Sequence, residues 1–311
     1  MSEILGLVSA VITTHNRKDL LLLAIQSVLN QTYKRIECIV VDDASTDGTK
    51  EMLNDYIKQG RLKYIYIPAE KSCGGNHARN IGIQNANGKY IAFLDDDDEW
   101  LPEKIEKQII AFEQNKDVGF VYCGLIREKN MNPDTRVQQD VSNPKYKDGD
   151  LSKEVLIHII TNTSAIMVKK EILDHCGYFD EALKYWQEYE LCIRILQITN
   201  AKCVRESLVL YRILQGDKSR LSNKLEGWEG NVKYIEEKHK VLLGMLSYQE
   251  EGMRKTYVCI DGFIRGKNAG SLFFMMKYMC IALWNRDIRK AVIKKIKNTM
   301  KNKKILGKRY L

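Results

Sequence analysis

Short apolar runs alternate with amphipathic segments over the first 123 residues, and this alternation limits the possible folds more than any other feature of the chain. Such runs are typical of buried strands, while the segments between them repeat apolar residues at helical spacing. A strict order of strand and helix predicts an α/β fold, with a mostly parallel, mixed sheet flanked by helices. The predicted strands cover residues 7–12, 36–41, 62–67, 90–94 and 118–123, and the predicted helices begin near Asp19, Thr49, Gly75 and Pro102.

Three of the predicted strands lead directly into polar loops. The first strand is followed by Thr13–Asn16, the second by Asp42 and Asp43, and the fourth by Asp95–Asp98. The carboxyl ends of parallel strands share one edge of a sheet, and ligands bind in the crevice beyond that edge. We therefore expect these loops, which lie far apart in the sequence, to meet in one functional site.

The loop after the fourth strand is strongly acidic, with five consecutive carboxylates from Asp95 to Glu99. Neighbouring carboxylates repel each other unless a cation or several hydrogen-bond donors lie beside them. In an extended chain Asp95 and Asp97 point to the same side, and paired carboxylates suit Mg²⁺ or Mn²⁺. The alternative is a solvated acidic turn before the helix at Pro102. The run alone favours neither interpretation, whereas its place among the other polar strand ends favours a functional site.

The second half of the chain carries one further acidic candidate, Glu188. It falls in the first turn of a predicted helix over 187–196, where an acid can simply complement the helix dipole, by less than ~1 kcal/mol. From about Trp228 the pattern becomes helical, which predicts a catalytic domain over 1–225 and a helical region over 226–311. Other predictions are a long polar connection over 127–150, helices over 151–160 and 171–175, and strands over 164–168 and 201–211.

The C-terminal end of the chain is strongly basic. Residues 286–311 contain eleven Lys or Arg and one acid, a net charge of +10, whereas the whole chain carries +9. The remaining body is thus near neutral, which argues against a nucleic-acid-binding core and for a tail that meets an anionic membrane surface. The apolar segment 272–284 is too short for a bilayer span of about 20 residues. It predicts either a helix in a membrane interface or one packed on the body.

Two further features predict a cytoplasmic protein, either free or peripheral on the inner face of the membrane. The eight cysteines are scattered without a CxxC pair, as expected of reduced, buried thiols. Residues 1–6 lack the basic start and the apolar run of a signal peptide.

Several motifs follow one another in order between residues 8 and 220. They are VSAVITTHN at 8–16, SVLNQTY at 27–33, VVDDASTDGT at 40–49, ARNIGI at 78–83, FLDDDD at 93–98, GYFDE at 177–181 and QEYEL at 187–191. Each motif alone is weak, but the ordered set closely resembles the inverting glycosyltransferases of family 2, with their Rossmann-like GT-A fold. The sequence has no Gln-x-x-Arg-Trp motif, which marks the processive synthases of that family, so the resemblance implies transfer of single sugars.

The resemblance implies a reaction as well as a fold. A hexosyl or N-acetylhexosaminyl group would pass from a nucleotide-diphosphate sugar, with UDP expected, to a hydroxyl of a glycan or lipid-linked sugar acceptor in cell-surface polysaccharide synthesis. A divalent ion, Mn²⁺ or Mg²⁺, would neutralise the leaving diphosphate, and a separate carboxylate would take the acceptor proton. By position, the donor would be bound by Thr13, His15, Asp42, Asp43, Lys71, Asp95, Asp96 and Asp97, the ion by Asp97 and Asp95, and the base would be Glu188. Arg212, with the nearby Lys218 and Arg220, could contact the diphosphate of the donor as a flexible lid.

The sequence departs from the family pattern at three positions. His15 stands where an aromatic ring is common, Glu188 where Asp is common, and Gln187 where an acid is often found. Two rival functions stay open. One is nucleotidyl transfer that forms a nucleotide sugar, although residues 13–17 lack the glycine-rich phosphate loop usual in such enzymes. The other is an inactive member that binds nucleotide and docks at a membrane, against which the intact carboxylates argue.

Overall fold

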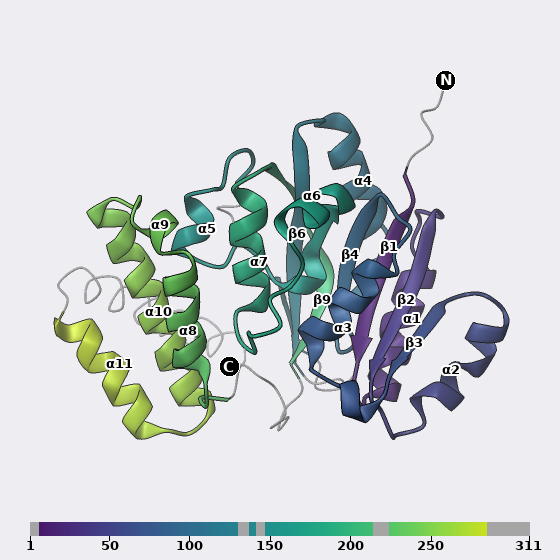
Figure 1. The fold of residues 1–311 in the computed structure, drawn as a ribbon, viewed down its shortest axis with the longest axis horizontal. Coiled ribbons are helices and arrows are strands. Elements are labelled where there is room, and N and C mark those ends of the chain that lie inside the picture. The colour runs from purple at the N-terminus through teal and green to yellow at the C-terminus, as the bar shows by residue number, and fades with distance from the viewer. Residues whose placement is uncertain (1–5, 130–136, 141–146, 214–223, 285–311) are drawn as a thin grey trace, which may run out of the picture. The chain divides into compact units, whose positions relative to one another are not determined.

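The computed structural model describes residues 6–129, 137–140, 147–213 and 224–284 (Figure 1). The chain divides into two compact units, one formed by residues 1–155 and 159–216 and the other by residues 156–158 and 217–311. The assignment of a catalytic domain to 1–225 and a helical region to 226–311 stays a proposal. The predicted basic tail lies outside the described residues, as do Lys218, Arg220 and part of the polar connection over 127–150.

The first unit is built on one nine-stranded sheet with the order β3-β2-β1-β4-β8-β6-β9-β5, in which β7 pairs with β6. The neighbours among β3, β2, β1 and β4 run parallel, as predicted. The antiparallel pairs are those of β8, which lies between β4 and β6, of β5 with β9, and of β7 with β6. The strands are β1 (Val8–Thr14), β2 (Ile36–Asp43), β3 (Lys63–Ile67), β4 (Tyr90–Asp95), β5 (Glu99–Trp100), β6 (Val118–Lys129), β7 (Val137–Asp140), β8 (Ile166–Lys169) and β9 (Asn200–Ile213).

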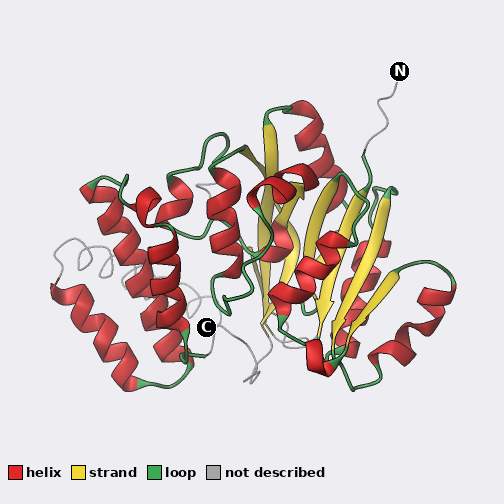
Figure 2. Ribbon diagram, in the orientation of Figure 1, coloured by secondary structure: helices red, strands yellow, loops and turns green. Residues whose placement is uncertain are grey.

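Helices cover both faces of this sheet (Figure 2). The helix predicted over 151–160 is confined to residues 154–157, so the prediction was wrong in extent. The helices of this part are α1 (Lys18–Leu29), α2 (Thr49–Lys58), α3 (Gly75–Gln84), α4 (Lys104–Gln114), α5 (Glu154–Ile157), α6 (Lys170–Cys176) and α7 (Gln187–Leu196), with 3₁₀ turns η1 (Ala69–Lys71) and η2 (Thr163–Ala165).

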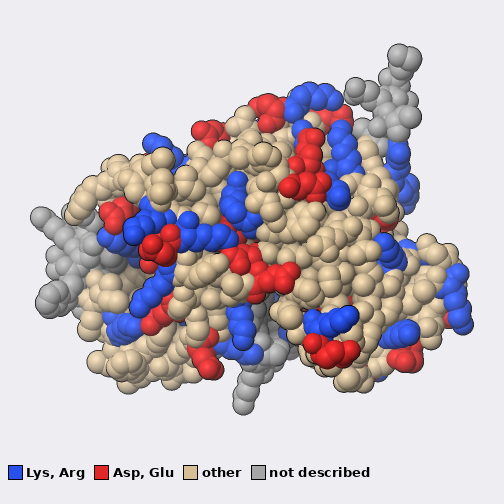
Figure 3. All heavy atoms as spheres, viewed as in Figure 1, with Lys and Arg blue, Asp and Glu red and all other residues tan. Residues whose placement is uncertain are grey.

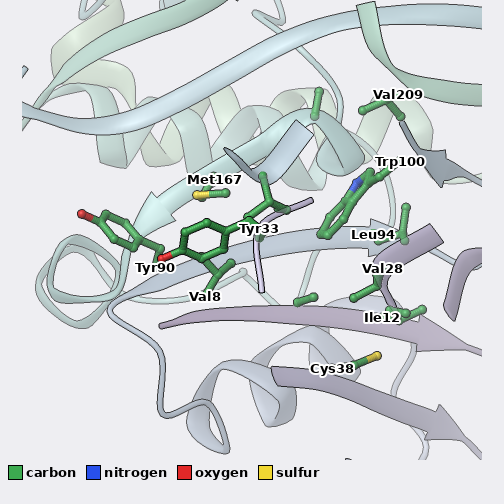
Figure 4. Close-up of a cluster of buried hydrophobic side chains, with 14 of the residues drawn as sticks. Val8, Ile12, Val28, Tyr33, Cys38, Tyr90, Leu94, Trp100, Met167 and Val209 are labelled. Atoms are coloured by element: carbon green, nitrogen blue, oxygen red, sulfur yellow. The ribbon is translucent and has the colours of Figure 1, made fainter. Parts of the chain in front are cut away.

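Alternation along the strands divides the core between the two faces of the sheet. Alternate residues of β1 and β4, among them Val8, Ile12 and Leu94, join α1 and α4 in one buried cluster, part of which Figure 4 shows. Because successive side chains of a strand point to opposite sides, the residues between them support helices on the other face. There the rings of Phe93 and Phe179 meet edge to face, with centroids 5.2 Å apart.

Glycine at position 82 explains one element of the ARNIGI motif. A Cβ atom at Gly82 would lie 2.3 Å from Cγ1 of Val11 on β1. Helix α3 can therefore approach the sheet closely only with glycine at this position. The close approach brings the polar side chains of α3 to the carboxyl end of the sheet.

One charged side chain lies in the core itself. Lys104 is fully buried in the first turn of α4, and its Nζ atom has no hydrogen-bond partner among the described residues. Nζ lies 3.9 Å from the centroid of the Trp100 ring. Burial lowers the pKa of Lys104 to about 7, because the charged form loses its hydration, although Cys123 opposes this shift.

The second unit contains the helices α8 (Trp228–Lys238), α9 (Lys240–Leu243), α10 (Tyr248–Asn268) and α11 (Leu272–Trp284). Helix α11 has the bounds predicted for the apolar segment. Within the described part of the chain, no helix combines the length and apolar character needed to cross a membrane. The face in Figure 3 intersperses acidic and basic side chains, as expected of a body that is near neutral without its tail.

Candidate active site

The structure brings the three polar loops to one edge of the sheet, as predicted. Thr13 on β1 lies between Val41 on β2 and Asp95 on β4 in the parallel register. Asp42 lies beside Thr14 in the same way. The loops that follow these strands therefore lie side by side, beyond the carboxyl ends of β1, β2 and β4.

The acidic run forms a turn rather than an extended chain. The amide of Asp98 donates a hydrogen bond to the carbonyl oxygen of Asp95 at 3.0 Å. As a result, Asp98 joins Asp95 and Asp97, and the three residues offer carboxylate oxygens within 4.8 Å of one another. Burial, together with the charges of Asp97 and Asp95, raises the pKa of Asp98 well above its usual range. An extended chain predicts two members of this cluster, Asp95 and Asp97, but not the third, Asp98.

Asp98 is the member whose oxygens are already engaged by the protein. Its carboxylate accepts hydrogen bonds from the Ser164 hydroxyl at 2.6 Å and from the Arg212 amide at 3.2 Å. Asp98 is 1% exposed, whereas Asp95 and Asp97 are only partly buried. Asp95 and Asp97 are therefore the better placed of the three to reach a cation.

Asp96 points away from this cluster. Its carboxylate accepts hydrogen bonds from the Thr14 hydroxyl at 2.8 Å and from Arg17 at 3.2 Å. Burial raises the pKa of Asp96 to about 6, against the lowering effect of Arg17. Arg17 also lies 3.5 Å from the carboxylate of Asp97. Arg17 was not among the predicted site residues, although it follows directly on the first polar loop.

The two neighbouring acids of the second loop differ in what they contact. Asp42 is buried, and its two oxygens accept hydrogen bonds from the Ser45 amide at 2.9 Å and from the Tyr64 hydroxyl at 2.7 Å. This placement gives Asp42 a role in holding the loop, and its contact with a nucleotide stays a prediction. In Asp43, one oxygen accepts a hydrogen bond from the Gly74 amide at 3.0 Å. The other, Oδ1, is buried without a hydrogen-bond partner among the described residues.

Two other predicted donor contacts lie near this loop. His15 is exposed, and its Nδ1 atom is hydrogen-bonded to the carbonyl oxygen of Asp43. Lys71 lies at the end of η1 and is exposed to solvent. Their contacts with a nucleotide stay predictions.

Left-handed backbone marks the loops of the site. The described non-glycine residues with positive φ are Asn16 (54°), Ala44 (63°) and Trp186 (56°). Asn16 follows His15, Ala44 follows Asp43, and Trp186 lies two residues before Glu188. Non-glycine residues adopt this conformation at a cost of order 1–3 kcal/mol, and such strain tends to gather at functional sites.

The two acids of the QEYEL motif have different surroundings. Glu190 is fully buried and forms an ion pair with Arg194 at 2.8 Å. Arg194 in turn donates to the carbonyl oxygens of residues 176–178, so this pair fixes the turn before α7. Glu188 lies in the first turn of α7 and is only partly buried. Glu188 is thus the acid of the motif that a substrate could reach.

Arg79 links the two ends of the site. Its guanidinium donates to Asp95 at 2.7 Å and to Oε1 of Gln187 at 3.0 Å, and it lies over the ring of Phe179. One side chain therefore braces the carboxylate cluster against the residue that precedes Glu188. The ARNIGI motif contains this residue, but the bridge could not be predicted from the motif, because Gln187 lies 108 positions away.

Two asparagines of α3 hold the loop that leads to α7. Asn80 donates to the carbonyl oxygen of Phe179 and to Glu181, and it accepts a hydrogen bond from the Phe179 amide. Asn76 donates to the carbonyl oxygens of Asp180 and Leu183. These contacts explain why the ARNIGI and GYFDE motifs occur together.

Arg212 was expected to contact the diphosphate from a flexible loop. The structure instead places its guanidinium in buried ion pairs with Glu128, at 3.0 Å, and with Glu99. Its amide donates to Asp98, so Arg212 supports the acidic turn from behind. Any contact with phosphate stays a prediction.

A match to a known protein family identifies the family of this chain. The model of glycosyl transferase family 2 matches residues 9–176, more than half of the chain. The chain belongs to glycosyl transferase family 2. A glycosyltransferase of Rickettsia prowazekii (strain Madrid E) is 30% identical over 273 residues, which cover 83% of this chain and 82% of the relative. The predicted enzyme class is thereby confirmed.

A second relative covers only part of this glycosyltransferase. The UDP-Glc:alpha-D-GlcNAc-diphosphoundecaprenol beta-1,3-glucosyltransferase WfaP of Escherichia coli is 44% identical over 124 residues, 40% of this chain and 48% of its own length.

Solved structures confirm the fold. TarS of S. aureus, residues 1–349 in complex with UDP-GlcNAc, aligns with a TM-score of 0.60 at 14% identity, over 88% of this chain and 90% of that one. The mannosyltransferase PcManGT from Pyrobaculum calidifontis, in complex with GDP-Man and Mn²⁺, aligns with a TM-score of 0.52 at 15% identity, over 95% and 81%. The fold of this glycosyltransferase is therefore GT-A, as the sequence predicted.

Proposed function

We propose that this glycosyltransferase moves one hexosyl or N-acetylhexosaminyl group from a UDP-sugar to a hydroxyl of a glycan or lipid-linked sugar, with inversion. The observation that carries the proposal is the buried, unpartnered Oδ1 of Asp43 at the same sheet edge as the carboxylates of Asp95 and Asp97. Further support is that the E. coli relative is named for UDP-Glc and that S. aureus TarS was solved with UDP-GlcNAc.

Asp43 would recognise the base of the donor. A buried acceptor without a donor costs about 1–3 kcal/mol, and the N3–H group of uracil would supply the missing hydrogen bond to Oδ1. Thr13 and His15, on the neighbouring loop, would line the ring. Asp42 would shape this pocket by holding the second loop.

Asp95 and Asp97 would hold Mn²⁺ or Mg²⁺, with Asp97 as the direct ligand. The oxygen-only cluster suits such hard cations. Burial, together with the charges of Asp97 and Asp95, raises the pKa of Asp98, and a divalent cation would relieve the local excess of negative charge. When bound, the ion neutralises the charge that develops on the leaving diphosphate. Arg79 and Arg17 would keep the carboxylates in place from either side.

Glu188 would act as the general base. It would take the proton from the acceptor hydroxyl as that oxygen attacks the anomeric carbon, opposite the leaving diphosphate. The alternative acid of the motif, Glu190, is held in its ion pair with Arg194. The bridge from Arg79 to Gln187 would fix the first turn of α7 relative to the donor.

The proposal extends to where the enzyme works. We place it at the cytoplasmic face of a membrane in cell-surface polysaccharide synthesis. The basic residues 286–311 would bind anionic headgroups and keep the enzyme near lipid-linked acceptors. Support comes from the E. coli relative, whose name includes a diphosphoundecaprenol acceptor.

A thermal-shift panel with UDP and GDP, each with and without Mn²⁺, tests the donor. A ligand at 100 times its dissociation constant adds about 2.7 kcal/mol of stability, so UDP with Mn²⁺ should give the largest shift. Asp43→Ala should abolish the shift with UDP. A larger shift with GDP, or none with any nucleotide, would contradict the donor assignment.

Turnover by a Glu188→Gln variant tests the base. General base catalysis contributes about 10²–10⁴-fold, so transfer should fall by that factor while the thermal shift with UDP and Mn²⁺ persists. Glu171→Gln is the matched control, because Glu171 is an exposed acid in the first turn of α6. If Glu188→Gln transfers sugar as fast as the control, Glu188 is not the base.

A further inference from the structure

Helix α11 exposes a continuous apolar stripe. Leu272 and Phe273 are 68% and 78% exposed, and Met276, Met279 and Cys280 are exposed as well. At 3.6 residues per turn these positions fall within an arc of about 120° on one side of the helix. The arc contains no charged residue.

Tyr278, on the side of α11 opposite the stripe, is buried. The Tyr278 ring lies 5.7 Å from the ring of Trp228, and its hydroxyl donates to Glu229 at 2.6 Å. Lys277 forms an ion pair with the same glutamate at 2.7 Å. At Gly262 on α10, a Cβ atom would come within 2.7 Å of the Tyr278 ring, so the two helices approach closely. These contacts fix the rotation of α11 and keep the stripe outward.

The composition of the stripe fits the boundary of a lipid bilayer. Thirteen residues of helix are about 20 Å long, too short to cross the hydrocarbon core of about 30 Å. A helix with one apolar side and one anchored side can instead lie in the plane of the interface. Helix α11 packs beside α10 within its unit (Figure 1).

The charge of the following residues argues for a bilayer over a second copy of the chain. Helix α11 leads directly into residues 286–311, which carry a net charge of +10. Pairing two copies through α11 would bring two such tails together, and like charges repel. An anionic surface would attract the tail while the stripe enters the acyl boundary.

We propose that α11 is the membrane-inserting element of this enzyme, with the side chains of Leu272, Phe273, Met276 and Met279 in the acyl boundary of an anionic bilayer. The inference rests on the membrane partner proposed above and names the surface that meets it. The apolar stripe inserts into the bilayer, and negative headgroups attract the basic tail.

Vesicle flotation of the full chain tests this proposal. The wild type should float with phosphatidylcholine vesicles that contain 30% phosphatidylglycerol, and it should float much less with pure phosphatidylcholine. The double variant Phe273→Glu/Met276→Glu should lower the partition coefficient at least tenfold, because each change removes an inserted apolar side chain. The control Val241→Glu/Met245→Glu changes two exposed apolar residues elsewhere in the same unit, and it should change partitioning less than twofold.

A second readout does not depend on the folding of a variant with added charge. An environment-sensitive fluorophore on Cys280, in a chain with Cys73→Ser, should shift to the blue when anionic vesicles are added. Cys73 is the other cysteine that is exposed, since Cys176 is partly buried and the remaining five are buried. The absence of a blue shift would overturn the proposal.

Other outcomes would also overturn the proposal. Equal partitioning of the two double variants would mean that the stripe does not insert. A dimer in sedimentation velocity that dissociates in Phe273→Glu/Met276→Glu, without a change in partitioning, would make the stripe an interface between copies. The thermal shift with UDP and Mn²⁺ separates the two proposals, because failed docking with an intact shift leaves glycosyl transfer standing.

Discussion

Replacing the buried Lys104 with methionine should stabilise the enzyme, by an amount that depends on pH. Methionine fills a similar volume and carries no charge. In the folded chain the pKa of Lys104 lies at about 7, whereas an unfolded lysine titrates near 10.5. Between these values the unfolded chain binds one more proton than the folded chain, so the stability of the wild type rises with pH.

The size of the effect follows from the pKa shift. One pKa unit corresponds to about 1.36 kcal/mol. Lys104 should therefore cost the wild type about 4 kcal/mol at pH 7.5, three units below the unfolded pKa, and about 1 kcal/mol at pH 9.5. The advantage of Lys104→Met should shrink by about 3 kcal/mol between the two pH values.

Urea unfolding of both chains at pH 7.5 and 9.5, followed by circular dichroism, measures this advantage. Lys116→Met is the matched control, because Lys116 is largely exposed and pairs with Glu113 at 3.0 Å. An exposed ion pair contributes about 0–1 kcal/mol, so the control should show little change at either pH. If Lys104→Met is less stable than the wild type, or if its advantage is the same at both pH values, the reasoning is refuted.

Three further predictions concern the site. Arg79→Met removes the bridge to Gln187 and should lower kcat about 10²-fold. The affinity for UDP should change less than tenfold, because the bridge acts on geometry rather than on donor binding. Arg79→Lys should not rescue kcat, since an ammonium cannot span both partners. Asn80→Ala leaves the backbone of the 177–183 loop without its partners and should lower the free energy of unfolding by about 3 kcal/mol, read from urea titrations. Asp97→Asn should raise the Mn²⁺ concentration for half-maximal transfer at least tenfold; an unchanged metal titration would exclude Asp97 as the ligand.

The sequence predicted those parts of the fold that depend on local patterns. The start at Thr49 and the bounds Leu272–Trp284 match their helices, because apolar periodicity and solvent exposure agree there. The antiparallel insertion of β8 between β4 and β6 was not foreseen. An apolar run such as Ile166–Lys169 predicts a strand but does not specify its neighbours, which are set by contacts between distant segments.

The site was predictable where a residue type and its position at a strand end suffice. The sheet-edge positions of Asp43, Asp95 and Asp97 were predicted in this way, whereas their contacts with the donor and the ion stay predictions. The bridging contacts of Arg79 were not predicted, because an arginine on a helix is usually solvated, whereas this one is buried. The contact of Arg212 with the diphosphate also stays a prediction, and the structure adds ion pairs with Glu99 and Glu128 that the sequence did not indicate.

The place of β8 in the sheet also sets the order in which the chain can complete its fold during synthesis. One edge of β4 pairs with β1, but the other waits for β8, which begins at residue 166. At the usual ~5–20 residues per second, translation from residue 95 to residue 166 takes several seconds. During that time one edge of β4 is unpaired, and an unpaired apolar edge favours pairing with other nascent chains. Chains that stop before residue 166 should therefore aggregate, even though they contain the strand-end carboxylates and the whole parallel half of the sheet.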